Sequence, residues 1–170
     1  MNRFLYKPMG IFCLTFLLVA LDQVTKGMAV KCLKGQEAFT LWEGVFEFRY
    51  LENQGAAFGM LQGQRVFFLF TGVIVLLVVI YLLGHMSKEK RYWPIRLIAI
   101  CILSGAWGNM IDRLCLGYVV DFFYFRLIDF PIFNVADIYV SVGTAVLVVL
   151  MLFYYKDEEL NHLLIRKGKG

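Results

Sequence analysis

Two aspartates, Asp121 and Asp137, stand in apolar segments of the sequence, where a carboxylate is costly. Ionisable groups at the edge of a hydrocarbon layer are functional candidates by default. If the fold brings both within hydrogen-bond reach of one water molecule, mutual repulsion and partial desolvation raise one of the two pKa values. One carboxyl then keeps its proton while the other acts as a base. This pair of residues predicts activation of a water molecule for attack on a carbonyl.

A structural explanation exists for Asp137 but not for Asp121. Asn134, three residues before Asp137, forms the pattern of a capping box, in which both side chains satisfy free amide groups at a helix start. Asp121 lies in an aromatic run with no helix start, and the next basic residue is Arg126. The chemical interpretation of the pair therefore depends on Asp121.

Two further pairs of polar residues are spaced four apart, so each pair shares one face of a helix. Asp22 and Lys26 can neutralise each other in apolar surroundings, and they can orient a catalytic group. The two roles do not exclude each other. Asn109 and Arg113 project together toward the outer surface. Arg113 either snorkels to the interface or holds a carboxylate or a substrate carbonyl.

The elements that must position these residues are membrane helices. The chain has 170 residues, of which 60% are hydrophobic and only 18% charged, and its mean hydropathy is +0.68. Runs of about 20 apolar residues span a bilayer as helices. We predict an all-α membrane protein with four transmembrane helices and a small extracytoplasmic β-sheet with a surface-lying segment. The expected single domain covers residues 1–170, with spans at residues 9–30, 66–84, 95–113 and 134–155.

The orientation follows from the basic residues. With the N-terminus in the cytoplasm, that side carries ten basic and four acidic residues, so the positive-inside rule places both termini there. The net charge of +4 then needs no nucleic acid as a partner. The first apolar run could also begin a cleaved signal peptide. No small-residue cleavage site follows, however, and Asp22 and Lys26 continue a helical pattern.

The two expected extracytoplasmic segments, residues 31–65 and 114–133, have patterns of their own. Residues 45–51 alternate between aromatic and charged side chains, which predicts a half-buried strand. The small residues that follow, Gly55, Ala56, Ala57 and Gly59, let a loop lie close to a ligand. Residues 114–133 are rich in aromatic side chains that suit the membrane interface.

The four cysteines lack metal-ligand spacing, and no metal or cofactor is predicted. Cys32 and Cys115 are the two that meet the exterior in this topology, so the sequence allows a disulfide between them without favouring it. Serine or cysteine catalysis is disfavoured because His85 and His162, the only histidines, fall on the cytoplasmic side.

Five motifs together resemble one known family, the bacterial lipoprotein signal peptidases, or signal peptidase II. They are residues 21–26 (LDQVTK), 52–59 (ENQGAAFG), 105–113 (GAWGNMIDR), 119–122 (VVDF) and 133–137 (FNVAD). Each motif alone is weak evidence, but the order and spacing of all five cover nearly the whole chain.

The resemblance implies a multi-pass aspartyl peptidase of the bacterial inner membrane, family A8, with its site at the extracytoplasmic face. Such enzymes cut prolipoproteins just before a diacylglyceryl-modified cysteine, and globomycin blocks them. The partners would be these substrates and membrane lipid, and the protein is expected to act as a monomer. Asp121 and Asp137 match the catalytic dyad. The surrounding polar or loop residues expected to support it or bind substrate are Asp22, Lys26, Asn53, Gly55, Asn109, Arg113 and Asn134.

Two other classes of function compete with this interpretation. A small proton-coupled transporter or channel would use Asp22, Lys26, Asp121 and Asp137 as a relay. The acidic residues gather at one face, however, and the second helix has no charge with which to continue a path. A non-catalytic membrane scaffold would require every polar residue above to be only a cap or a snorkelling charge.

Overall fold

The computed structural model describes residues 7–55 and 61–163 of the chain. Four of its helices are long and apolar enough to cross a membrane, and a small sheet accompanies them. This confirms the predicted fold class. The elements in chain order are α1 (Pro8–Leu33), β1 (Phe39–Trp42), β2 (Phe46–Asn53), α2 (Arg65–His85), η3 (Lys90–Tyr92), α3 (Trp93–Cys115), β3 (Val119–Tyr124), η4 (Arg126–Ile128), α4 (Val135–Phe153) and α5 (Asp157–Leu163).

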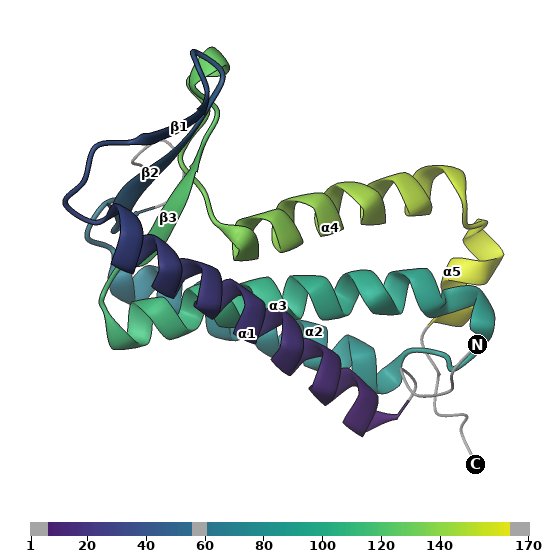
Figure 1. Cartoon of the computed structure of the whole chain (residues 1–170). Helices are drawn as coiled ribbons and strands as arrows, with labels where there is room; N and C mark the ends of the chain where they lie inside the picture. Colours follow the sequence, from purple (N-terminus) through teal and green to yellow (C-terminus); the bar gives the residue numbers. More distant parts are fainter. Residues whose placement is uncertain (1–6, 56–60, 164–170) are drawn as a thin grey trace.

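Helix α3 is the centre of the bundle. It packs against α1, α2 and α4, and the sheet stands at the end of the bundle where α1 and α3 finish (Figure 1). In the most apolar stretch of each span, half of the residues of α3 are buried, against at most 17% in the other three helices. The outer sides of those helices carry exposed apolar residues such as Phe16, Phe70 and Val149. Lipid-facing helices have this distribution, because hydrocarbon replaces water as their solvent.

The sheet is antiparallel in the order β1-β2-β3, and it joins the two segments that precede α2 and α4. The alternating aromatic residues of the predicted strand lie in β2, where Phe48 pairs with Phe123 of β3 with ring centroids 5.7 Å apart. An irregularity in the ladder follows, and Leu51 then pairs with Asp121. Asp121 is therefore fixed on a strand, and its position does not depend on a free loop.

The structure also bears on the predicted cysteine pair and on the small residues that follow β2. Cys32 and Cys115 are free and exposed, so the disulfide that the sequence allowed is absent. Of the small residues expected to lie near a ligand, Gly55 is buried, whereas Ala56, Ala57 and Gly59 lie outside the described residues.

We predict that Gly105→Ala destabilises the packing of α3 on α4. A Cβ at Gly105 would meet the Ala136 carbonyl oxygen and lie 2.7 Å from Val140 Cγ2, and the backbone oxygen cannot move aside. Such overpacking costs about 1–3 kcal/mol. The measurement is thermal unfolding in detergent, with Gly27→Ala as the matched control, because a Cβ there has nothing within 4 Å. Equal melting temperatures for the two variants would contradict this account of the α3–α4 contact.

Candidate active site

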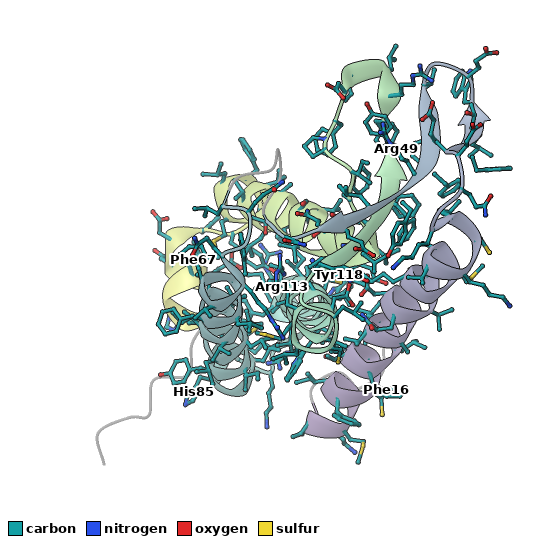
Figure 2. All side chains as sticks on the ribbon, turned by 90° about the vertical axis from the view of Figure 1, so that its left-hand side faces the viewer. Phe16, Arg49, Phe67, His85, Arg113 and Tyr118 are labelled. Atoms are coloured by element: carbon teal, nitrogen blue, oxygen red, sulfur yellow. The ribbon has the colours of Figure 1, made fainter. Side chains whose placement is uncertain are left out.

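A cluster of buried polar side chains lies where the sheet meets the helices, at the end of the bundle seen in Figure 2. The exposed fraction is 2% or less for five of its members, which are Asp22 and Lys26 of α1, Asp112 of α3, Asp121 of β3 and Asn134 at the start of α4. Buried polar groups need hydrogen-bond partners, so this cluster must be internally satisfied. Asp137 is only partly buried and therefore remains within reach of a ligand.

Asn134 contacts both predicted catalytic aspartates. Its Nδ2 donates to Asp121 Oδ1 at 2.6 Å, and its Oδ1 accepts from the Asp137 backbone N–H at 2.9 Å. The Asn134 backbone N–H in turn donates to Asp137 Oδ2 at 3.1 Å, which completes the predicted capping box. The cap and the site are thus one arrangement, because the same asparagine that starts α4 brings Asp137 close to Asp121.

Asn109 forms the second link between the aspartates. Its Nδ2 donates to Asp137 Oδ1 at 2.8 Å, while its Oδ1 accepts from Lys26 Nζ at 2.8 Å and from Asn134 Nδ2 at 3.1 Å. An ammonium group can only donate hydrogen bonds. Lys26 therefore fixes which end of the Asn109 amide is the oxygen, and the amide N–H is left to face Asp137.

Asn53 ties the end of β2 to the same site. Its Nδ2 donates to Asp121 Oδ2 at 2.8 Å, and its Oδ1 accepts from the backbone N–H of Gly55 at 2.9 Å. Each oxygen of Asp121 thus receives one amide donor, from Asn53 and from Asn134. Gly55 is thereby connected to the Asp121 carboxyl through the side chain of Asn53.

The pKa of Asp121 is raised from its ordinary value near 3.8 to about 7. Burial is the main cause, because it penalises the charged form, and the charge of Asp137 adds to it. The hydrogen bonds from Asn53 and Asn134 act in the opposite direction and hold the pKa down. At neutral pH this carboxyl therefore exchanges readily between its protonated and ionised forms.

The expected Asp22–Lys26 ion pair is present and belongs to a larger group. Lys26 Nζ lies 2.9 Å from Asp22 Oδ2 and 3.0 Å from Asp112 Oδ2. Asp22 Oδ1 accepts from the backbone N–H of Ala136 at 2.9 Å, and Asp112 Oδ2 accepts from that of Val120 at 3.1 Å. One ammonium thereby connects α1 and α3, and its two carboxylate partners hold the starts of α4 and of β3.

Sequence reasoning overlooked Asp112 and Gln23. Gln23 Nε2 donates to Asp112 Oδ1 at 2.9 Å and to the Gly108 carbonyl at 3.2 Å. The available signal was an acid at the apolar end of α3, four residues after Gly108 and therefore on the same face as that glycine. A Cβ on Gly108 would run into the carboxylate of Asp22, so a small residue is required there.

Arg113 is partly buried and lies on the wall of a small cavity. The cavity has a volume of about 260 Å³, lies between α2, α3 and α4, and is also lined by Asn109 and Asp137. The guanidinium lies over the ring of Phe68 at 4.8 Å, and Nη1 donates to the Asn109 carbonyl at 3.4 Å. A cation beside a carboxyl-lined cavity can bind a carbonyl oxygen of a ligand.

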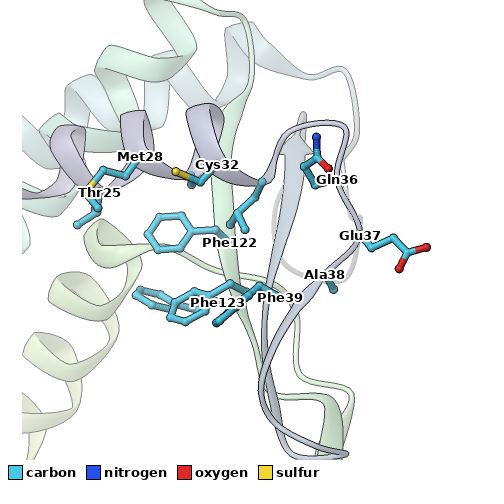
Figure 3. A pocket seen from close by; sticks show the side chains of 12 residues that line it. Thr25, Met28, Cys32, Gln36, Glu37, Ala38, Phe39, Phe122 and Phe123 are labelled. Carbon is cyan, nitrogen blue, oxygen red and sulfur yellow. The ribbon is translucent and has the colours of Figure 1, made fainter.

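A larger apolar groove lies on the other side of the cluster, between α1 and the sheet (Figure 3). Its volume is about 800 Å³, and its walls include Met28 and Cys32 of α1 and Phe48, Phe122 and Phe123 of the sheet. Phe122 and Phe123 directly follow Asp121 in β3, so the groove begins next to the site.

Solved structures with the same overall fold are bacterial membrane enzymes. One, determined at 2.3 Å resolution by the in meso method, has a TM-score of 0.72 and 25% sequence identity over 94% of both chains. Another, at 1.9 Å, has the same TM-score and 28% identity over 85% of this chain. The chain thus has four helices able to cross a membrane and the fold of bacterial membrane enzymes.

The sequence comparisons narrow this class to one family. The profile of signal peptidase (SPase) II matches residues 14–153. The lipoprotein signal peptidase of Clostridioides difficile is 41% identical over 81% of this chain and 91% of its own length. That of Caldanaerobacter subterraneus is 42% identical over 85% of this chain and 97% of its own length. The chain therefore belongs to the signal peptidase II family, and the comparisons do not support a transporter.

The raised pKa of Asp121 predicts a pH-dependent stability. A carboxyl whose folded pKa is raised contributes stability that is complete below about pH 4 and lost as the pH rises through about 7. Asp121→Asn removes this loss. The free energy of unfolding of the variant minus that of the wild type should therefore be larger at pH 8 than at pH 5, by about 2 kcal/mol. Thermal unfolding of both proteins at the two pH values measures it, and an equal difference at both would contradict the assignment.

Lys26→Met should be strongly destabilising. Removing one partner of a buried ion group leaves an uncompensated charge, at a cost of about 3–5 kcal/mol. The matched control is Lys34→Met, because Lys34 pairs with Glu52 at 2.7 Å on the exposed surface, where such pairs are worth at most about 1 kcal/mol. Adding Asp112→Asn to Lys26→Met should recover part of the loss. Similar unfolding temperatures for both lysine variants would disprove the central role of Lys26.

Proposed function

We propose that Asp121 and Asp137 are the catalytic dyad of an aspartic-type signal peptidase II. The observation that carries the proposal is the double contact of Asn134, which donates to both carboxyls and so keeps them within reach of one substrate bond. Membership of the family supports removal of signal peptides from prolipoproteins. The assignment to the aspartic type of peptidase rests on the two carboxyls.

The dyad works by sharing one proton between two carboxyls. Because the pKa of Asp121 is about 7, this carboxyl is protonated in a large share of the molecules at neutral pH. In the proposed mechanism the pair holds one proton, and the carboxyl without it acts as the base. The ionised carboxylate removes a proton from a water molecule, and the water oxygen attacks the scissile peptide carbonyl. The protonated carboxyl donates a hydrogen bond to the developing oxyanion. When the tetrahedral intermediate collapses, a carboxyl delivers a proton to the leaving amine.

Three asparagines keep the dyad ready for this chemistry. Asn53, Asn109 and Asn134 supply amide N–H donors to the carboxyls, which orients them without adding a positive charge. Lys26 and Asp22 position Asn109 and the start of α4. Arg113, on the wall of the cavity that Asp137 also lines, binds a carbonyl oxygen of the substrate.

The substrate is a prolipoprotein whose cysteine carries a diacylglyceryl group, cut just before that cysteine. Such a lipid enters from the bilayer, and its chains need an apolar surface beside the scissile bond. The groove between α1 and the sheet offers this surface next to Asp121. The strand β2 and Gly55 then hold the peptide on the side where Asn53 contacts the dyad.

The basic residues support a position of the dyad at the extracytoplasmic face of the inner membrane. The end of the bundle opposite the sheet carries α5 and the connection between α2 and α3 (Figure 1). The positive-inside rule assigns this end to the cytoplasm. Lipidated precursors reach the outer leaflet with their cysteine at the surface, which is the level of the sheet. The proposed enzyme is a single-domain monomer whose site is complete within one chain.

Cleavage of a purified diacylglyceryl-modified prolipoprotein tests the proposal. Asp121→Asn and Asp137→Asn should each reduce cleavage at least about 100-fold, because each removes one half of the acid–base pair. The matched control is Asp129→Asn, which changes an exposed carboxyl bound to Tyr124 at 2.6 Å outside the site. The same precursor without its lipid measures the contribution of the acyl chains.

The outcomes separate the parts of the proposal. Wild-type cleavage by either dyad variant, with the fold intact by thermal unfolding, would exclude that residue as catalytic. Equal cleavage of lipidated and unmodified precursor would exclude the lipid as a recognition element and leave the dyad untouched.

A further inference from the structure

A second apolar groove runs along the bundle from the end opposite the sheet to the level of Trp107. It has a volume of about 400 Å³ and opens between α1, α2 and α3. Its walls include Phe12 of α1, Ile80 of α2 and Leu103 of α3, and two basic residues, Lys88 and Arg96, also line it. Neither the proposed reaction nor the packing of the polar cluster uses this groove.

The length of the groove matches one leaflet of a bilayer. Arg96, in the first turn of α3, and Trp107 both line it, and they lie roughly 16 Å apart along the axis at a rise of 1.5 Å per residue. Half of the hydrocarbon core of a membrane is about 15 Å thick. An acyl chain that follows the groove would therefore run from the level of Arg96 to the middle of the bilayer.

The basic residues occupy the surface end of this groove. Arg96 is 2% exposed, and its guanidinium donates to the carbonyls of Leu83 at 3.2 Å and Met86 at 2.9 Å, which fixes it beside the last turn of α2. Lys88 is exposed in the connection between α2 and α3, so its ammonium can meet a headgroup. Basic pockets between membrane helices on the cytoplasmic side bind anionic lipid headgroups.

We propose that this groove is a binding site for one anionic glycerophospholipid of the inner leaflet. One acyl chain lies along the apolar walls, and the phosphate and the anionic headgroup lie at the exposed ammonium of Lys88, while the buried guanidinium of Arg96 adds positive charge beneath them. Charge complementarity selects the headgroup, and the apolar walls distinguish a lipid from a free phosphate.

Native mass spectrometry of the full chain tests the proposal, with phosphatidylglycerol and phosphatidylcholine competing in equal amounts. The wild type should retain one phosphatidylglycerol in preference to phosphatidylcholine. Each basic residue near a membrane surface contributes about a five-fold preference, so Lys88→Ala should lower the selectivity by about that factor. The matched control is Lys90→Ala, which removes the same charge from the same connection but from a residue that does not line the groove.

A second variant tests the chain-binding part without changing any charge. Gly84 lines the groove, and a Cβ added there has nothing within 4 Å, so the position accepts a side chain and Gly84→Leu places apolar bulk at the groove. It should abolish retention of phosphatidylglycerol, while Gly27→Leu, at another open glycine, should not. Glycerol phosphate without acyl chains should fail to displace the lipid.

Each contrary result would overturn the proposal. Equal losses of lipid selectivity for Lys88→Ala and Lys90→Ala would mean that the selectivity depends on the general charge of the surface. Retained selectivity in Gly84→Leu would place the lipid elsewhere, and equal retention of both lipids by the wild type would make the groove a nonselective lipid contact. The measurement reads lipid binding alone, so none of these outcomes depends on the dyad.

Discussion

The buried ammonium of Lys26 is the interaction on which the site depends. It lies between the carboxylates of Asp22 and Asp112 and donates to the amide of Asn109. A charge in such a place is tolerated only when its partners are complete, because desolvation costs several kcal/mol per ion. All of its partners come from α1 and α3, so these helices have little freedom to slide. Through the two carboxylates, the same ammonium also sets where α4 and β3 begin.

This constraint explains features that are otherwise unrelated in the sequence. Gly108 must be small because its Cβ would occupy the place of the Asp22 carboxylate, and Gly105 because α4 passes close to it. The strand that carries Asp121 is attached to the bundle at Val120, whose backbone N–H donates to Asp112. Phe133 then pairs with Phe123 of the strand, which places the next residue, Asn134, beside β3. The geometry around the two aspartates therefore follows from backbone anchors and not from the aspartates themselves.

Much of this could be predicted from the sequence, and the exceptions have physical reasons. Hydrophobic runs specify membrane helices, and the alternation before Leu51 specified a strand, because both patterns are local. The capping box of Asn134 and Asp137 was also local, since its partners are three residues apart. Asp112 was overlooked because its partners Lys26 and Val120 belong to other elements, and no spacing along the chain reveals them. For the same reason the sequence could place Asn109 beside Arg113 but could not show that its amide faces Asp137.

The choice of asparagine around the aspartates is itself a physical requirement of the proposed chemistry. Amide donors from Asn53, Asn109 and Asn134 orient the carboxyls without placing a positive charge beside the pair. With lysine at any of these positions, the pair would lose its shared proton and with it the acid that the leaving amine needs. Lys26 also lowers the pKa of Asp121, but by less than burial and the charge of Asp137 raise it. The cation can thus organise the site through Asn109 while the proton stays on the dyad.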